Sequence, residues 1–496
     1  MQNSRRCLAI IGGGATGTAA FIAAIKKRVA SKIYVIDPKP PGRGAVFANT
    51  DDDILCNTTV ATTSIDHDKP LDFLDYLSDI GYGATEDTFA PRRVAGDYIV
   101  SRFELYHQKA RQSGIDVIHI PRSCTSVKIL SHGKYELIFS GGIDIPPLLA
   151  TDVIFCTGYS PPIIPDSFKS YSECESFISS PYPEDAMLSR LPASSEVLLI
   201  GSKLSAIDAA LVLCREGHRV TMISPSGELP AVRPNIRIKE YEVDREYLKA
   251  MLCLWGRERL NLDERILMRR YFRYFIRTIA ELSEVPLKKQ FSHASTPAVR
   301  LREDIVIAER AECCWQDGIF RWIEAANAIY LQDSDDFKGG LAPYFRHWFG
   351  RYLTPVALPN AKKILNYIDG NVMTIEKGSV SAVSLSKNSA AWRVSWGGRV
   401  HYFDAVVCAS GFHYPKHVID NSGAIIVSHS GEHNCHAIKI DNNYSIRRLD
   451  GGLGESIWFI GATLHERIFA TGALFLITAQ AKSVIENMAT MKFLDI

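Results

Sequence analysis

The sequence predicts an α/β protein with two Rossmann-like dinucleotide-binding domains, the first of them discontinuous, and a helical insertion. An apolar strand, a glycine-rich turn, a helix and a second apolar strand follow one another from residue 7, and the same order returns from residue 196. Strands that alternate with helices in this way form parallel sheets. The length of 496 residues also favours two or three domains, because a single hydrophobic core does not grow to that size.

The first of these units carries a complete dinucleotide-binding turn. Residues 7–11 (CLAII) form an uninterrupted apolar run, as in a strand that is buried on both faces. The turn GGGATG follows, with Gly12, Gly14 and Gly17 at its three glycine positions. These glycines permit a tight turn, a close approach of the backbone to a pyrophosphate, and close packing of helix on strand. The N-terminus of the next helix then faces the phosphates.

An acidic residue ends the second strand of this unit. Residues 32–36 (KIYVI) lead to Asp37, 20 positions after Gly17, where a carboxylate accepts hydrogen bonds from the hydroxyls of an adenosine ribose. Because a carboxylate repels a 2′-phosphate, we expect FAD or NAD at this site rather than NADP. The loop at residues 41–47 (PGRGAVF) favours FAD, since its glycines and Arg43 suit a pyrophosphate.

Three later apolar strands lead to small residues and glycine. They are residues 152–156 before Gly158, residues 404–409 before Gly411, and residues 457–460 before Gly461 and Ala462. We predict that all three complete the first domain, which then comprises residues 1–190 and 395–496. An apolar helix from about residue 468 follows, and in FAD domains such a helix directs its N-terminus at the flavin O2 atom.

The second unit has an altered turn. Residues 196–200 (EVLLI) continue through Gly201, Ser202 and Lys203 into a helix, so the turn reads GxKxxA. Alanine is accepted at the third position, whereas lysine stands where the backbone would approach a pyrophosphate. Lys203 either pairs with a phosphate of NADPH or fills the site and abolishes nucleotide binding. The second strand of this unit ends without an acid, and Arg233 is the nearest candidate for a 2′-phosphate.

Residues 191–394 are assigned to this second, NAD(P)H-type domain, with a helical insertion at about residues 235–340. The insertion contains few glycines that would mark turns, and it mixes apolar residues at helical spacing with many arginines and acidic residues. Salt-bridged surface helices are the expected structure. The functional alternative is a substrate lid or a surface for an acidic carrier partner.

Several runs of residues together resemble a known family: GRGAVF, ILCN, FAPRR, CTG, GSKLSAIDAAL and SPSGELP. They are similar to bacterial FAD/NAD(P)-binding proteins, distant relatives of the ornithine and lysine N-hydroxylases and the flavin-containing monooxygenases. The resemblance covers residues 7–230 well and residues 340–496 more loosely. It implies FAD at the first site and NADPH at the second, and it identifies no substrate. The family usually has glycine in place of Lys203 and arginine after Ser224.

Pattern and resemblance together predict the residues that contact FAD and NADPH (or NADH). They are Gly12, Gly14, Ala15, Thr16, Gly17, Asp37, Arg43, Gly44, Asn57, Gly158, Gly201, Ser202, Lys203, Gly411, Gly461 and Ala462. The arginines at 43, 92 and 93 are equally compatible with solvated surface charges.

Catalytic side chains are not defined by any motif. Asn57 and His465 are the candidates, since His465 follows Gly461 closely and would lie near the flavin, although a structural histidine is the alternative. No metal site is expected, because His429, His433, Cys435 and His436 match no standard zinc spacing. The sequence contains no GxSxG run, which argues against a serine hydrolase.

Composition limits the partners and the compartment. The formal net charge of +1 gives no preference for nucleic acid or membranes, and no run of about 18 apolar residues occurs. We therefore expect a small-molecule substrate and no nucleic-acid or membrane partner; a carrier protein or a second copy of the chain stays open. The 11 cysteines form no CxxC pair, which argues against a dithiol reductase and favours reduced thiols. Glycine spacing in the N-terminal apolar run argues against a signal peptide, so a cytoplasmic location is expected.

Three hypotheses for function remain open at this point. In the preferred one, NADPH reduces FAD and an oxygen atom of O2 is transferred to nitrogen, sulfur or carbon of a small metabolite, with N-hydroxylation of an amino-acid-like compound taken from the resemblance alone. In the second, the substrate itself reduces FAD in an oxidase or dehydrogenase, and the Lys203 site is vestigial. In the third, a non-enzymatic flavoprotein binds a partner through its helical insertion.

Overall fold

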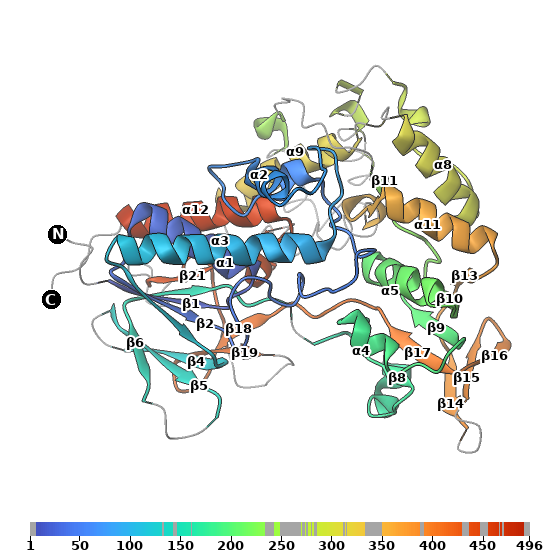
Figure 1. Cartoon of the computed structure of the whole chain (residues 1–496), viewed down its shortest axis with the longest axis horizontal. Coiled ribbons are helices and arrows are strands. Elements are labelled where there is room, and N and C mark those ends of the chain that lie inside the picture. Colours follow the sequence, from blue (N-terminus) through green and yellow to red (C-terminus); the bar gives the residue numbers. More distant parts are fainter. Residues whose placement is uncertain are drawn as a thin grey trace, which may run out of the picture.

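Two five-stranded parallel sheets organise the chain (Figure 1). The computed structural model describes residues 6–130, 133–141, 146–159, 161–233, 243–248, 269, 273, 276–278, 280–281, 285–310, 313, 315–332, 350–386, 391–428, 436–446, 455–465, 467–468 and 471–490. Each sheet contains one of the two predicted strand–turn–helix–strand units, and the predicted fold class is confirmed.

The first sheet has the strand order β21-β7-β1-β2-β3. Its strands are β1 (Cys7–Ile11), β2 (Lys32–Ile36), β3 (Asp116–Ile120), β7 (Asp152–Phe155) and β21 (Ile457–Phe459). The helices α1 (Ala15–Lys27), α3 (Arg92–Gln112) and α12 (Leu474–Thr490) cover one face (Figure 1). Apolar side chains from these helices and from both faces of β1 enter one continuous core.

A six-stranded antiparallel sheet packs on the other face of the first sheet, and its residues share that core. It combines two distant parts of the chain, in the order β20-β18-β19-β4-β5-β6. The strands are β4 (Cys124–Ile129), β5 (Tyr135–Phe139), β6 (Leu148–Ala150), β18 (Lys416–Ile419), β19 (Ala424–Ser428) and β20 (His436–Ala437).

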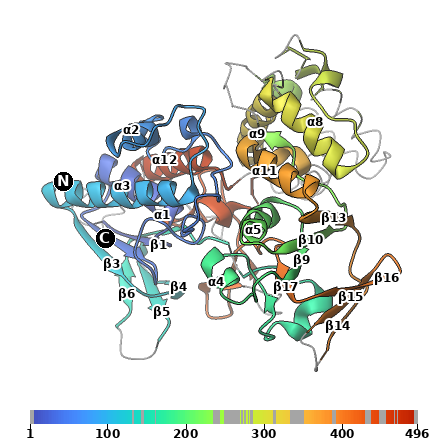
Figure 2. The ribbon, with the colours of Figure 1, turned by 45° about the vertical axis from the view of Figure 1, so that its right-hand side comes forward.

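The second parallel sheet has the order β13-β10-β9-β17-β8. Its strands are β8 (Phe177–Ile178), β9 (Glu196–Ile200), β10 (Arg219–Ser224), β13 (Met373–Lys377) and β17 (Ala405–Cys408). Helices α5 (Leu204–Arg215), α8 (Pro297–Glu309) and α11 (Leu358–Asp369) pack together in one core beside it (Figure 2). The antiparallel strands β14 (Ala382–Leu385), β15 (Trp392–Trp396) and β16 (Arg399–Phe403) pack elsewhere on the sheet, around the buried Trp392.

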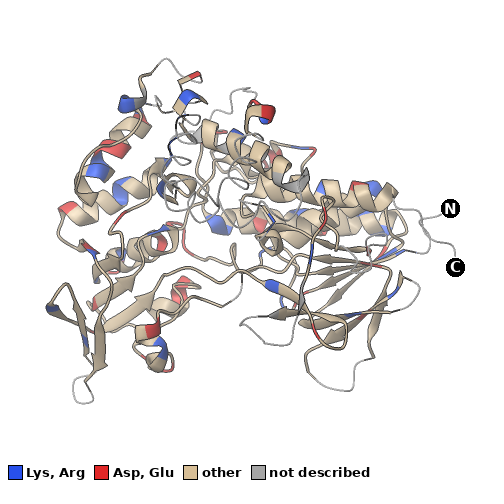
Figure 3. Cartoon of the chain, turned by 180° about the vertical axis from the view of Figure 1, so that it is seen from behind, with Lys and Arg blue, Asp and Glu red and all other residues tan. Residues whose placement is uncertain are grey.

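The remaining helices, strands and turns complete the described structure. They are α2 (Asp72–Asp79), α4 (Glu184–Leu188), α9 (Trp315–Gln332), β11 (Val232–Arg233), β12 (Val356–Ala357), and the 3-10 turns Val60–Thr62, Asp166–Tyr171, Leu287–Lys289 and Gly461–Leu464. Basic and acidic residues are interspersed along the helices, including α8 (Figure 3). Within the described ranges, no helix is long and apolar enough to cross a membrane.

Two expectations from the sequence need correction. The strand that leads to Gly411 was expected in the first domain, but β17 pairs in parallel with β9 and β8 in the second sheet. Its apolar pattern fits a central strand of either sheet, and only the long-range pairing distinguishes them. The last helix begins at Leu474 rather than near residue 468, and a 3-10 turn at Gly461–Leu464 follows β21 instead.

The glycines of the first turn are required by contacts across the sheet. A Cβ atom on Gly12, which has a φ of +104°, would lie 2.5 Å from the carbonyl oxygen of Cys156 after β7. A Cβ atom on Gly17 would lie 1.9 Å from the carbonyl oxygen of Gly12. The turn between β1 and α1 is therefore packed as closely as backbone atoms allow.

We predict that Gly17→Ala lowers the free energy of unfolding by about 1–3 kcal/mol, because α1 must move away from β1 to accept the methyl group. Urea unfolding followed by circular dichroism measures this difference. Gly83→Ala is the matched control, since a Cβ atom there meets nothing within 4 Å. Equal stability of the two variants would contradict the packing argument.

Candidate dinucleotide-binding sites

Asp37 and the first glycine turn are held together by backbone hydrogen bonds. The amide of Gly12 donates to the carbonyl of Ile36 at 2.8 Å, and the amide of Gly13 donates to Oδ2 of Asp37 at 2.8 Å. The other carboxylate oxygen accepts the amide of Lys39 at 2.8 Å. A carboxylate has about four acceptor positions, so Asp37 can still accept the hydroxyls of a ribose.

The loop that the sequence placed near the pyrophosphate lies against this turn. The amide of Gly42 donates to the carbonyl of Gly13 at 2.8 Å. A Cβ atom on Gly14 would lie 3.2 Å from Cα of Gly44, and one on Gly44, whose φ is +57°, would lie 2.9 Å from Cα of Gly14. Backbone therefore meets backbone at the start of α1, with Ala15 next in the chain, as a site for a pyrophosphate requires.

Arg43, Arg92 and Arg93 are all engaged with carboxylates in the structure. Arg43 pairs with Asp97 on α3, which directs its guanidinium along that helix. Arg93 pairs with the exposed Asp52 at 2.7 Å. The side chain of Arg92 is only 12% exposed and pairs with the buried Asp208, so a solvated surface charge is the wrong interpretation for this residue.

The end of β21 meets the start of α1. Gly461 has a φ of +73°, and a Cβ atom there would lie 3.0 Å from Oγ1 of Thr16. Its amide donates to Oε1 of Gln480 on α12 at 2.9 Å. Two predicted cofactor residues from opposite ends of the chain, Thr16 and Gly461, are thus neighbours, with Ala462 buried beside them.

An aromatic and histidine cluster lies at the same edge of the first sheet. His465 stacks on Tyr414 with ring centroids 4.6 Å apart, and Tyr414 lies 5.3 Å from Tyr159, the residue after Gly158. These rings come from three segments that are distant in the sequence. Asn57, the other catalytic candidate, follows the buried Cys56, whose amide donates to the carbonyl of Ala90 at 2.8 Å.

His417, which no motif had singled out, anchors the cluster. Its Nε2 lies 3.2 Å from Oγ1 of Thr157, and its ring packs edge-on against Phe155 and Phe459 at 4.8 and 5.2 Å. Burial, with a smaller contribution from His465, lowers the pKa of His417 to about 3. The ring is therefore neutral at physiological pH. A single histidine in β18 has no sequence pattern that would reveal this position.

The second turn repeats the backbone geometry of the first. Gly201 has a φ of +120°, and a Cβ atom there would lie 2.4 Å from the carbonyl oxygen of Ala409, just as Gly12 approaches Cys156. Gly411 follows at this edge and accepts a hydrogen bond from the amide of Ile163 at 2.9 Å. Gly411 therefore lies beside the second turn rather than the first, because β17 belongs to the second sheet.

Lys203 caps the N-terminus of α5 in an extended conformation. Part of its side chain stays exposed, yet burial lowers the pKa of its amine, Arg351 lowers it further, and Glu228 opposes both. Ser202, by contrast, is buried and lies 2.7 Å from the hydroxyl of Ser224. The turn therefore presents a cation at the position where the first turn presents Gly14.

A buried polar cluster joins the two domains. Nη2 of Arg92 on α3 lies 3.0 Å from Oδ2 of Asp208 on α5, and the hydroxyl of Tyr182 donates to the same oxygen at 2.5 Å. Burial raises the pKa of Asp208, while Arg92 and the tyrosine hydroxyl oppose the rise. Further contacts surround this cluster: Glu184 accepts the amides of Thr50 and Asp51 at 3.2 and 3.3 Å.

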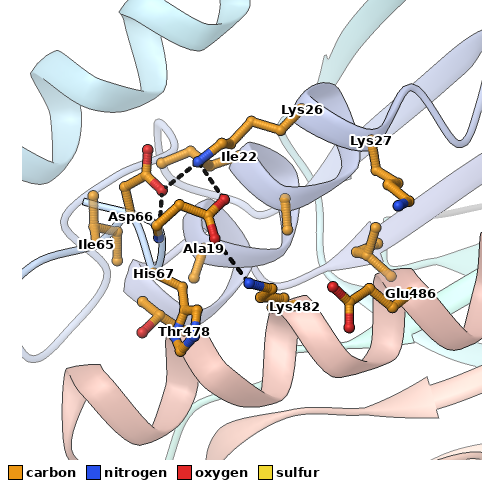
Figure 4. Close-up of a pocket in the computed structure, with 13 residues that line it drawn as sticks. Ala19, Ile22, Lys26, Lys27, Ile65, Asp66, His67, Thr478, Lys482 and Glu486 are labelled. Atoms are coloured by element: carbon orange, nitrogen blue, oxygen red, sulfur yellow. Dashed lines mark hydrogen bonds and ion pairs between the residues drawn. The ribbon is translucent and has the colours of Figure 1, made fainter. Parts of the chain in front are cut away.

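One groove lies away from both turns (Figure 4). It has a volume of about 320 Å³ between α1 and α12. Lys26 pairs with Asp66 and Asp68 at 2.7 and 2.6 Å, and Lys482 pairs with Asp68 at 2.9 Å. None of the predicted cofactor residues lines this groove, and two of its lysines are neutralised by Asp66 and Asp68.

Comparison with protein families identifies the first domain. Residues 9–160 match the family model described as FAD-NAD(P)-binding, and this segment holds the first turn, Asp37 and β7. This part of the chain is an FAD-NAD(P)-binding domain. The predicted cofactor class is thereby confirmed. No curated protein matches the sequence.

Solved structures match the chain over almost its entire length. The reduced form of ornithine hydroxylase from Pseudomonas aeruginosa has 11% identity and a TM-score of 0.51, covering 98% of each chain. L-lysine 6-monooxygenase from Pseudomonas syringae has 14% identity and a TM-score of 0.53, covering 98% of this chain and 100% of the other. An FAD-bound cadaverine monooxygenase from Erwinia amylovora has 14% identity and a TM-score of 0.54, covering 99% and 96%. At such identities the likeness establishes the shared fold.

The described parts of the chain contain no group of three or more His, Cys, Asp or Glu side chains arranged to hold a metal ion. Three of the four residues that the sequence raised and set aside for zinc, at 429, 433 and 435, lie outside the described residues.

We predict that Arg92→Ala destabilises the protein by about 3–5 kcal/mol, because it leaves Asp208 buried without its cation. The pKa of Asp208, already raised by burial, then rises further above its unfolded value. A folded state that holds the proton more tightly loses stability as the pH rises through this interval. The deficit should therefore be smaller at about pH 5 than at about pH 8 in urea unfolding.

The control for this prediction is the double variant Arg92→Ala/Asp208→Asn, which removes the orphaned charge and keeps a polar group beside Tyr182. It should be more stable than Arg92→Ala alone, with little dependence on pH over the same range. An equal deficit in the single and double variants would show that lost packing, and not the unpaired carboxylate, is responsible.

Proposed function

We propose that this chain is an FAD-dependent monooxygenase that takes electrons from NADPH and N-hydroxylates a small amino-acid-like metabolite. The observation that carries the proposal is the pair of glycine turns, one at the carboxyl edge of each parallel sheet, in domains joined by Arg92 and Asp208. Two dinucleotide sites in one chain suit an enzyme in which one nucleotide reduces the other.

The first turn fits FAD. Its backbone approach at Gly14 and Gly44 leaves no Cβ atom between the start of α1 and a pyrophosphate, and Asp37 has acceptor capacity for a ribose. When bound, FAD supplies the redox and oxygen chemistry. The N–H groups at the start of α1 and Asp37 would bind it, and Gly461 at the end of β21 leaves the space beside Thr16 that a side chain would fill.

The edge of the first sheet suits a reaction from which water is excluded. His417 is neutral at physiological pH and packs edge-on against the stacked rings of Phe155 and Phe459, so this edge carries uncharged rings. The hydrogen bond between His417 and Thr157 holds the segment that leads to Gly158 and Tyr159. His465, stacked on Tyr414, remains the candidate for orienting a substrate or moving a proton.

An amine as the substrate class is supported by the names of the solved structures, which are an ornithine hydroxylase, an L-lysine 6-monooxygenase and a cadaverine monooxygenase. All three compounds carry a terminal amino group on a flexible chain. They are therefore the first probe amines for this protein.

The proposal predicts that NADPH bleaches the flavin absorbance of the purified protein under anaerobic conditions. Admission of air with a suitable amine, tested first with ornithine, lysine and cadaverine, should give the hydroxylated amine, detected by mass spectrometry. In Gly201→Ala, NADPH should fail to bleach the flavin while dithionite still does, because a Cβ atom there meets the carbonyl of Ala409 at 2.4 Å.

Flavin that stays oxidised with NADPH and NADH in the wild-type protein would contradict the monooxygenase. Bleaching by an amine or another metabolite alone, with formation of hydrogen peroxide in air, would replace it with an oxidase in which the Lys203 turn has no catalytic role.

A further inference from the structure

The loop after β10 is bound to the second glycine turn. The hydroxyl of Ser202 donates to the carbonyl oxygen of Glu228 at 2.8 Å, and the amide of Gly227 donates to Oγ of Ser224 at 3.0 Å. These bonds place Glu228, in the loop that follows the second strand of the unit, beside the turn, so the expectation that no acid stands at this strand end is wrong. In Rossmann units the adenosine ribose lies at this strand end. A carboxylate here would by itself favour a ribose with free hydroxyls.

Glu228, however, is surrounded by cations. Nη1 of Arg300 lies 2.9 Å from Oε1 of Glu228. Burial lowers the pKa of Lys203, at the start of α5, and the charge of Glu228 opposes this shift. Two positive charges and one negative charge leave a net positive group at this position. The buried Arg351 adds no free charge, because it pairs with Asp304.

Arg300 is held in place by the insertion. It lies on α8, whose Leu301, Ile305 and Ala308 are buried in the core of the second domain. Its Nε donates to the carbonyl of Ala294 at 2.9 Å, which orients the guanidinium toward the strand end. Arg302, on the same helix, pairs instead with Asp369 at the end of α11 at 2.8 Å. The predicted insertion therefore contributes a wall of the second site.

We propose that Arg300 and Lys203 bind the 2′-phosphate of NADPH, and that the Glu228 carboxylate neutralises these two cations when the nucleotide is absent. This inference rests on the proposed function and names the residues that select NADPH over NADH. A phosphate that enters takes the place of the Glu228 carboxylate on the Arg300 guanidinium, whose planar donors suit phosphate oxygens. Lys203 stands where the turn usually has glycine. Its side chain supplies a positive charge to the phosphate in place of the close backbone contact that a glycine would make.

The test uses the full-length FAD-containing protein and isothermal titration with 2′,5′-ADP and 5′-AMP, which differ only in the 2′-phosphate. The wild-type protein should bind 2′,5′-ADP more tightly. Arg300→Ala should weaken 2′,5′-ADP binding about tenfold or more and leave 5′-AMP binding unchanged, since a charged hydrogen bond is lost. Glu228→Gln should strengthen 2′,5′-ADP binding, because it removes the competing carboxylate.

Arg302→Ala is the matched control and should change neither affinity, because this arginine pairs with Asp369. An unchanged preference for 2′,5′-ADP in Arg300→Ala would overturn the assignment, as would wild-type protein that binds neither nucleotide. Weaker 5′-AMP binding in Glu228→Gln, with no gain for 2′,5′-ADP, would overturn it in favour of a site that holds the bare ribose of NADH.

Flavin reduction on the same preparations separates this inference from the proposed function. If NADPH bleaches the wild-type flavin but Arg300→Ala keeps its preference for 2′,5′-ADP, the proposed NADPH-dependent enzyme is supported and the proposed role of Arg300 is wrong. If the preference depends on Arg300 but NADPH never bleaches the flavin, the proposed 2′-phosphate site is supported and the proposed monooxygenase activity is wrong.

Discussion

The buried ion pair between Arg92 and Asp208 is the interaction on which the arrangement of the two sites depends. It joins α3, which covers the first sheet, to α5, which begins at the second glycine turn. A guanidinium and a carboxylate removed from water are stable only as a pair with additional hydrogen bonds, and Tyr182 supplies one of these. Since neither charge is tolerated alone, the domains are held where both partners meet. Exposed pairs near it, such as Arg93 with Asp52 at 2.7 Å, add less, because water screens them.

The glycine turns of the two domains have the same backbone geometry and differ at one side chain. In each, the glycine after the first strand approaches the carbonyl oxygen of the residue after a neighbouring strand: Gly12 meets Cys156, and Gly201 meets Ala409. The helix that follows starts at the same place relative to its sheet. The difference is Lys203, which gives the second site a charge where the first has Gly14 and Gly44 in backbone contact. Both turns can bind a dinucleotide by backbone donors, but only the second adds a cationic side chain to them.

The insertion belongs to the second domain in a structural sense. Its helix α8 shares a core with α5 and α11, so the arginine-rich segment that the sequence presented as a solvated surface also provides buried contacts. Arginine side chains on α8 serve different neighbours according to their direction: Arg300 reaches Glu228 and Arg302 reaches Asp369. Charge content alone could not distinguish these two roles, because both residues satisfy the same helical pattern.

The sequence by itself determined the local units: the apolar strands β1, β2 and β9, the glycine turns, and Asp37 at the end of β2. These features depend on residues within about 30 positions of one another, so spacing is sufficient to predict them. Only the tertiary structure decided that β17 joins the second sheet, that His417 packs against Phe155 and Phe459, and that Arg92 meets Asp208. Each of these depends on contact between distant segments, and an apolar strand, a histidine or an arginine has the same local pattern whichever partner it finds. The sequence is sufficient to predict the chemistry of single residues, whereas only the folded structure shows which residues contact one another.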